Sequence, residues 1–142
     1  KKGQLKSNAP FEGEGVFYHD SCIFGRKMGV FDEPREILKG MAGFKLLSAD
    51  KERKKSRCCG FPALANEPKT ALAMAKKVVD SAIEAGAKKL VTSGCPGCYY
   101  ALKMSGGMEV VDITEILCET INDKTEDGKT GEDRVRQGGI HV

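Results

Sequence analysis

The sequence predicts an α/β fold, a mainly parallel sheet of about four strands with helices on both faces in a Rossmann-like layering. Short apolar runs alternate along the chain with longer segments of helical periodicity. Thirty-five residues separate Cys22 from Cys58, and thirty-five more separate Cys59 from Cys95. Because one strand with its returning helix takes roughly 30 residues or slightly more, this interval indicates a repeated βα unit.

The first βα unit is expected to begin with a strand over 15–19, a short run of β-branched and aromatic residues. Residues 20–31 are expected to form a loop that holds Cys22. A helix then begins at Asp32, a capping acid followed two residues later by a proline, and ends near Gly43.

The second unit is expected to begin with a strand over 44–47, which leads through a charged loop to the vicinal cysteines. The clearest helix pattern covers 67–85, with Asn66 as its cap and Gly86 as its stop. Its apolar residues recur at helical spacing and are expected to face the core: Leu72, Ala75, Val78, Val79, Ala82 and Ile83.

The last two strands are expected over 88–92 and 108–112. A helix opens at Cys95 after the first of them, and another covers 113–121 after the second. Cys118 lies on this last helix beside apolar residues, so we expect it to be a small buried hydrophobic side chain.

The domain organisation is read as a linker over 1–14, one cysteine-rich domain over 15–121 and a polar, flexible tail over 122–142. The sequence does not begin with methionine, so we expect a fragment of a longer chain. A net charge of +3 gives no argument for nucleic acid or membrane binding. No apolar run approaches the ~20 residues of a spanning helix.

Six cysteines without a secretion signal are typical of a reducing compartment, so we expect a cytoplasmic protein, peripheral to a membrane only through a partner. Because the carboxyl ends of parallel strands meet at one edge of the sheet, we expect five thiols to converge there. These thiols belong to Cys22, Cys58, Cys59, Cys95 and Cys98.

Three kinds of chemistry use cysteines in such a pattern. A structural zinc site needs four ligands, and a thioredoxin-like dithiol site needs two, here Cys95 and Cys98. An iron–sulfur cluster is held by thiolates and can use more than four. The helix that opens at Cys95 would stabilise thiolates with its positive dipole end. We therefore expect an iron–sulfur cluster, with zinc and the dithiol site as alternatives.

The cysteine pattern resembles the CCG-type cysteine-rich domain of heterodisulfide reductase B and D subunits, shared with the iron–sulfur subunits of glycolate and lactate oxidase. Residues 22–98 follow its pattern C-x35-C-C-G-x34-C-x-x-C. Residues 18–26 are similar to its Y-H-D-P-C-x-x-G-R, with Ser21 in place of proline, and residues 33–38 are similar to its E-P-R-E-x-L. The resemblance covers roughly residues 15–117.

The resemblance implies that all five cysteines bind a non-cubane [4Fe-4S] cluster that serves disulfide reduction or electron transfer in an oxidoreductase. It also implies partners: a flavoprotein or iron–sulfur subunit of a redox complex, and a second CCG domain. Near the cysteines, four further residues are expected to support the site: His19, Asp20, Arg26 and Gly60. The basic run over 51–57 is read as a solvated loop, or as a docking site for an acidic partner or a negatively charged coenzyme.

Overall fold

The sheet of the computed structural model, which describes residues 13–122, has four strands that all run parallel. Their order across the sheet is β2-β1-β3-β4, so the chain starts in the middle and crosses over between β2 and β3. The α/β class and the parallel sheet are confirmed. The strands are β1 (Gly15–Tyr18), β2 (Lys45–Leu47), β3 (Lys89–Thr92) and β4 (Glu109–Asp112).

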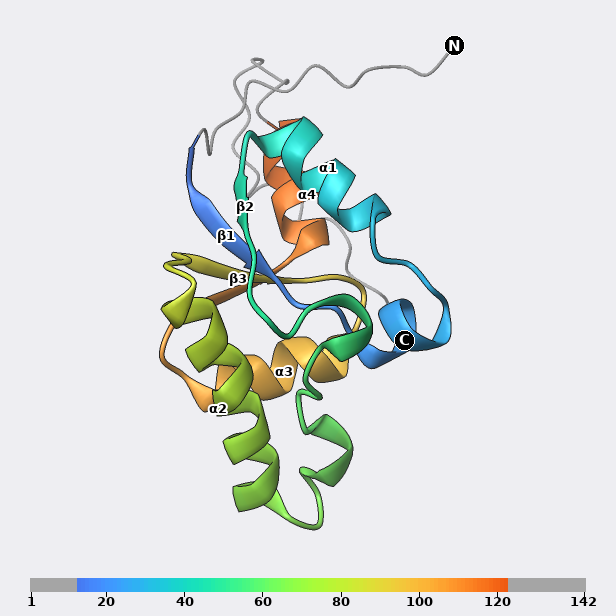
Figure 1. Ribbon diagram of the computed structural model, residues 1–142, viewed down its shortest axis with the longest axis vertical. Helices are drawn as coiled ribbons and strands as arrows, with labels where there is room; N and C mark the ends of the chain where they lie inside the picture. The colour runs from blue at the N-terminus through green and yellow to red at the C-terminus, as the bar shows by residue number, and fades with distance from the viewer. Residues whose placement is uncertain (1–12, 123–142) are drawn as a thin grey trace, which may run out of the picture.

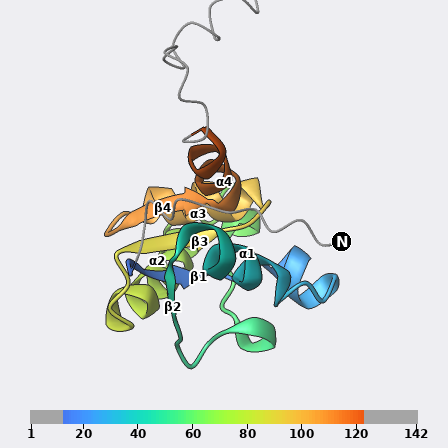
Figure 2. The same ribbon diagram turned by 90° about the horizontal axis from the view of Figure 1, so that it is seen from above.

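Helices cover both faces of this sheet, as predicted (Figures 1 and 2). Helices α1 (Glu33–Ala42) and α4 (Ile113–Asn122) pack together on one face. Helices α2 (Pro68–Glu84) and α3 (Pro96–Ser105) pack together on the other. Each strand except β2 is followed within four residues by a helical segment that begins at the carboxyl edge of the sheet.

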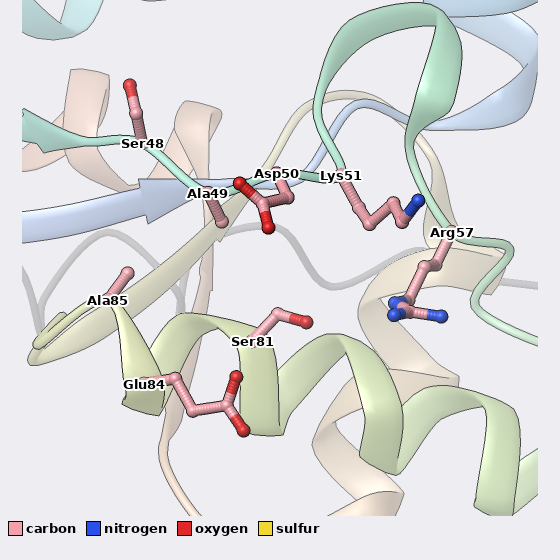
Figure 3. Close-up of a pocket in the computed structure, with 8 residues that line it drawn as sticks. All are labelled: Ser48, Ala49, Asp50, Lys51, Arg57, Ser81, Glu84 and Ala85. Atoms are coloured by element: carbon pink, nitrogen blue, oxygen red, sulfur yellow. The ribbon is translucent and has the colours of Figure 1, made fainter.

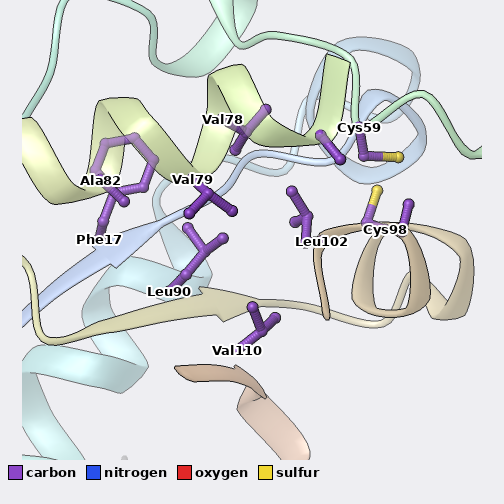
Figure 4. Packing of buried hydrophobic residues seen from close by; sticks show 11 residues of the cluster. Phe17, Cys59, Val78, Val79, Ala82, Leu90, Cys98, Leu102 and Val110 are labelled. Atoms are coloured by element: carbon purple, nitrogen blue, oxygen red, sulfur yellow. The ribbon is translucent and has the colours of Figure 1, made fainter. Parts of the chain in front are cut away.

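Two hydrophobic cores result, one on each face of the sheet. The core under α1 and α4 contains Val16, Tyr18, Leu38, Phe44, Val91, Ile113 and Ile116. The core under α2 and α3 is larger and includes two of the cysteines among its buried residues: Phe17, Cys59, Ala75, Val78, Val79, Ala82, Leu90, Cys98, Ala101, Leu102 and Val110 (Figure 4). We call this second face the thiol face.

Local structure differs from the predictions at several points. The segment after β1 is not simply a loop, because Cys22–Lys27 forms a short π-helical segment. The cap of α2 is Glu67 rather than Asn66, and it makes no side-chain capping bond. The predicted set of buried residues on α2 differs from the structure at both ends of the helix. Ala71 was not predicted to be buried but is, and Ile83 was predicted to be buried but is exposed.

The prediction that Cys118 is buried is wrong, because its side chain is exposed. Helix α4 buries Ile113, Ile116 and Thr120, which recur at helical spacing on one face. Cys118 lies two residues from both Ile116 and Thr120, and residues two apart on a helix do not share a face.

The linker expected over 1–14 and the tail expected over 122–142 fall almost entirely outside the described residues, which begin at 13 and end at 122. Within that described range, none of the helices combines the length and the apolar character that a membrane crossing requires.

Candidate functional site

The cysteines of the pattern follow the strands from which the sequence predicted them. Cys22 begins the π-helical segment that comes four residues after β1, and Cys95 is the N-cap residue of α3, directly after β3. Cys58 and Cys59 lie between β2 and α2, in the segment that leads into a short 3₁₀ turn, Phe61–Ala63. The turn contacts both α2 and α3.

Cys59 and Cys98 join the two cysteine motifs across the thiol face, where their side chains lie side by side (Figure 4). Both are buried. A hydrogen bond from the Cys98 thiol is the largest cause that lowers the pKa of Cys59 to about 6, and the backbone N–H of Phe61 adds to it. The pKa of Cys98 is raised, because its proton is held by Cys59 and burial disfavours its charged form. The bond that the two thiols share thus favours the charged form of Cys59 and disfavours that of Cys98.

The sulfurs of Cys58 and Cys95 accept hydrogen bonds from the backbone. The N–H of Gly60 lies 3.4 Å from the Cys58 sulfur, and the N–H of Cys98 lies 3.4 Å from the Cys95 sulfur. The second bond takes up one of the free N–H groups at the start of α3, where the helix dipole favours negative charge. Both sulfurs thus already accept a hydrogen bond from the backbone of their own motif.

The segment of Cys22 adjoins the segment of Cys95. A Cβ atom placed on Gly94 would lie 3.0 Å from the ring of Phe24, two residues after Cys22, so the two loops pack tightly. Among residues 13–122, no three Cys, His, Asp or Glu side chains stand close enough together to chelate one metal ion. The contact between thiols that the described residues do show is the one between Cys59 and Cys98.

Asp20, expected as a support of the site, ties these loops to the body of the domain. Its side chain is 1% exposed and accepts two bonds from Arg35, at 2.7 and 2.8 Å. It also accepts a bond of 2.7 Å from the backbone N–H of Arg53. Arg35 further lies over the ring of Tyr18, 4.9 Å from its centre, and 3.4 Å from Glu52. One buried carboxylate therefore links the end of β1, helix α1 and the segment before Cys58.

Sequence analysis expected Asp20 only as a support near the cysteines and missed this tie to Arg35 and Arg53. The Cys22 segment has a side-chain cap of its own. That cap is Ser21, whose hydroxyl accepts from the N–H of Phe24 at 3.2 Å. Arg53 has a φ of 53°, a left-handed conformation that is rare for a side chain of its size. The strain is offset because the conformation directs its N–H at Asp20. Arg35 lies in the segment 33–38 that resembles the family pattern, but its position there does not show that it pairs with Asp20.

The other expected supports behave differently from one another. His19 is buried and has a pKa lowered to about 4, chiefly by burial, with the charge of Arg26 adding to the effect. Arg26 itself is exposed and forms no ion pair within the described part of the chain. Gly60 has a φ of 81°, and a Cβ there would come within 2.5 Å of the Ala71 carbonyl oxygen. Glycine is thus required beside the vicinal cysteines.

Exposed apolar side chains surround the thiols. Ile23 follows Cys22, Phe61 follows the vicinal pair, and Tyr100 lies on the first turns of α3. Phe61 packs on Gly97, where a Cβ would come within 2.5 Å of its ring, and meets Tyr100 edge-on at 6.4 Å between ring centres. We call Ile23, Phe61 and Tyr100 the apolar rim.

A pocket lies beside the site, between the segment after β2 and helix α2 (Figure 3). Lys51 and Arg57 line it together with Asp50 and Glu84, so its charge is mixed. None of the cysteines lines this pocket, although Arg57 directly precedes Cys58. Most of the basic run over 51–57 is exposed, as expected for a solvated loop.

A parallel α/β sheet that gathers thiols from three loops at one edge defines a cysteine-rich α/β domain. The particular family follows from comparison with known proteins. The model of the family described as CCG, a cysteine-rich domain, matches residues 16–103, and the chain belongs to that family. The resemblance drawn from the cysteine spacing is thereby confirmed.

Curated relatives of the chain are named as iron–sulfur oxidoreductases or as parts of oxidoreductase complexes. The D subunit of the dihydromethanophenazine:CoB--CoM heterodisulfide reductase of Methanosarcina barkeri is 34% identical over 113 residues, which cover 75% of this chain and 27% of the relative. The "Probable iron-sulfur-binding oxidoreductase FadF" of Bacillus subtilis is 28% identical over 132 residues, covering 85% and 18%. The "Probable glycolate oxidase iron-sulfur subunit" of Bacillus subtilis is 31% identical over 120 residues, covering 78% and 26%. The chain thus spans less than a third of each.

Replacing Asp20 by asparagine is expected to destabilise the domain strongly. The change leaves Arg35 buried without its carboxylate, and breaking a buried ion pair costs about 3–5 kcal/mol. Asp32→Asn is the matched control, because Asp32 pairs with Arg53 at the surface and makes no capping bond. Urea unfolding of the reduced metal-free protein measures both. Equal losses of unfolding free energy in the two variants would contradict the stabilising role of the buried Asp20 carboxylate.

Gly60→Ala is expected to cost more stability than Gly86→Ala. Both glycines have a positive φ, near 80°, but a Cβ at Gly86 meets nothing within 4 Å. The left-handed conformation costs each alanine about 1–2 kcal/mol. Contact with the Ala71 backbone adds about 1–3 kcal/mol at position 60 alone. Thermal and urea unfolding compare the two, and similar values would contradict the close approach of Gly60 to α2.

The stability of the metal-free protein is expected to fall as the pH drops from 6.5 to about 4. His19 is neutral in the folded protein down to a pKa of about 4 but gains its proton near 6.5 when unfolded. Its contribution is therefore complete above pH 6.5 and lost through this window, on the order of 3 kcal/mol in all. In His19→Gln this part of the pH dependence should vanish. An unchanged profile in that variant, measured by urea unfolding at each pH, would refute the assignment.

Proposed function

We propose that the chain binds an iron–sulfur cluster through Cys22, Cys58, Cys59, Cys95 and Cys98, and acts as the cluster-bearing domain of a heterodisulfide-reductase-like oxidoreductase. The observation that carries this proposal is the buried contact between Cys59 and Cys98. It brings the two cysteine motifs together, although more than thirty residues separate them in the sequence. We take residues 15–121 as the domain.

The donor set fits an iron–sulfur cluster. The pKa of Cys59 is lowered by its bond from Cys98, and the sulfurs of Cys58 and Cys95 already accept backbone N–H groups. Such bonds stabilise thiolates and tune the reduction potential of a cluster. Five thiols exceed the four that close a tetrahedral zinc site. They support the larger, non-cubane [4Fe-4S] cluster as the form that binds here, with zinc as the competing occupant.

When bound, such a cluster supplies single electrons at a site that the chain keeps partly dry. The role of this chain's residues is to hold and shield it. Cys59 and Cys98 anchor one side in the hydrophobic core of the thiol face. Gly60 lets the vicinal-cysteine segment pack closely on Ala71 of α2, and Gly97 lets the ring of Phe61 pack on α3. The domain then either reduces a disulfide substrate directly or relays electrons to the partner that does.

The surroundings of the cysteines support docking to other subunits of a redox complex. The apolar rim of Ile23, Phe61 and Tyr100 is exposed, as large apolar side chains at interfaces are before the partner binds. The relatives named as subunits of heterodisulfide reductase and glycolate oxidase are consistent with a flavoprotein or iron–sulfur subunit as partner. A second CCG domain is the further partner we propose. Six free cysteines suit a reducing compartment such as the cytoplasm.

Anaerobically purified, iron-loaded protein is expected to be brown and to hold several irons with acid-labile sulfide. Cys59→Ser should lower the affinity for iron by at least about tenfold, because it removes a thiol whose pKa is lowered in the folded protein. Cys118→Ser is the matched control, since Cys118 is exposed on α4 and outside the cysteine pattern. Iron, zinc and sulfide are quantified per chain.

The same assay separates the alternatives. Stoichiometric zinc without sulfide or visible absorption would replace the cluster by a zinc-stabilised structural module. Full disulfide-reducing activity in a variant that lacks both Cys58 and Cys59 would favour a dithiol enzyme that uses Cys95 and Cys98. Loss of iron in Cys118→Ser as large as in Cys59→Ser would contradict the assigned ligand set.

A further inference from the structure

His19 stands out because the Nε2 atom of its buried imidazole has no hydrogen-bond partner. Its side chain is 2% exposed, and its Nε2 is the one fully buried side-chain nitrogen or oxygen between residues 13 and 122 that makes no hydrogen bond. Buried polar groups in folded proteins nearly always have a partner, because a missing bond costs free energy. The unpaired Nε2 therefore indicates that a further group binds in this part of the domain and forms the missing hydrogen bond.

The alternation of side chains along β1 places His19 on the same face as the buried thiols. Tyr18 and Asp20 both contact Arg35, so they share the α1 side of the sheet. Phe17 lies on the opposite side, in one core with Cys59 and Cys98. Successive residues of a strand point to opposite faces, so His19 shares the side of Phe17. It is two residues nearer than Phe17 to the carboxyl edge.

The neighbouring strand provides a direct comparison. The N–H of His19 donates to the Val91 carbonyl at 2.9 Å, which continues the β1–β3 ladder and sets His19 beside Thr92. Thr92 is also fully buried, but its hydroxyl donates to Asp112 at 3.0 Å. Two buried polar side chains thus lie next to each other at the end of the sheet. The Thr92 hydroxyl has a hydrogen-bond partner, whereas the Nε2 of His19 has none.

We propose that the Nε2–H of His19 donates a hydrogen bond to a sulfur of the bound cluster or of its cysteine ligands. This inference rests on the function proposed above and assigns His19 as a positioning residue. Burial keeps the imidazole neutral at pH 7, with its pKa lowered to about 4, so the ring carries one N–H donor. A donor to sulfur stabilises the more negative, reduced cluster and so raises its reduction potential.

The first test is an anaerobic redox titration of His19→Leu, His19→Gln and Thr92→Val in the iron-loaded protein. His19→Leu removes the donor and is expected to lower the ratio of reduced to oxidised cluster about tenfold at a fixed potential, which is about 59 mV for a one-electron couple. His19→Gln keeps an N–H donor and should shift the potential less. Thr92→Val removes a buried polar group that already has its partner, so its potential should match that of the wild type.

The outcomes distinguish this inference from the function on which it rests. A wild-type protein without iron and sulfide overturns both. Full loading of His19→Leu with the wild-type potential overturns the role of His19 alone, and so does an equal shift in Thr92→Val.

A second measurement uses the wild-type fold and does not depend on whether the leucine variant loads. The sequence contains two histidines, so ¹⁵N-histidine labels only His19 and His141. In the reduced, paramagnetic protein we expect a weak ¹⁵N hyperfine coupling by pulsed electron paramagnetic resonance, retained in His141→Gln and lost in His19→Gln. A coupling as strong as that of a ligating nitrogen, or none in His141→Gln, overturns the proposal.

Discussion

The buried carboxylate of Asp20 is the interaction on which the arrangement of the cysteine loops depends. It receives two bonds from Arg35 on α1 and one from the backbone of Arg53, in the segment that leads to the vicinal cysteines. Removing two opposite charges from water is costly, and the cost is offset only when good geometry and further hydrogen bonds satisfy both partners. Here the carboxylate has three donors, and the guanidinium also lies over the ring of Tyr18. These bonds hold the end of β1 close to the segment that leads to Cys58. The two segments are far apart in sequence, so the chain between them would not by itself keep them together.

The alternation of side chains along β1 and the two residues after it places the ion-pair network on one face of the sheet and the buried thiols on the other. On one face of the sheet, Tyr18 and Asp20 contact Arg35 and hold the loops in place. On the other face, Phe17 packs with Cys59 and Cys98, and His19 follows with its free nitrogen. Because side chains alternate strictly along a strand, four consecutive residues serve two different environments. A shift of one residue in the register would exchange them, so the ion-pair network also fixes which residues face the thiols.

Much of this fold was predictable from local pattern. The equal cysteine intervals predicted the repeated βα unit, and the apolar runs predicted the four strands within a residue or so at each end. Features that depend on contacts between distant segments were not predictable in this way. The pairing of Asp20 with Arg35 and Arg53 joins residues 15 and 33 positions apart, and nothing in the local sequence marks it. Cys118 was misjudged because apolar neighbours in sequence do not show which face of a helix is buried.

The five thiols are not equivalent, and their difference in burial gives the site an inner and an outer side. Cys59 and Cys98 lie inside the hydrophobic core, whereas the other three cysteines are partly exposed. The inner pair shares a hydrogen bond and cannot move without disturbing α2 and α3, so it provides the rigid part of the site. Of the outer cysteines, Cys22 and Cys95 lie at the start of helical segments, and Cys58 lies beside Cys59 in the chain. The large apolar side chains that follow the cysteine motifs in sequence, those of Ile23, Phe61 and Tyr100, are exposed as well, so solvent reaches the site from its outer side.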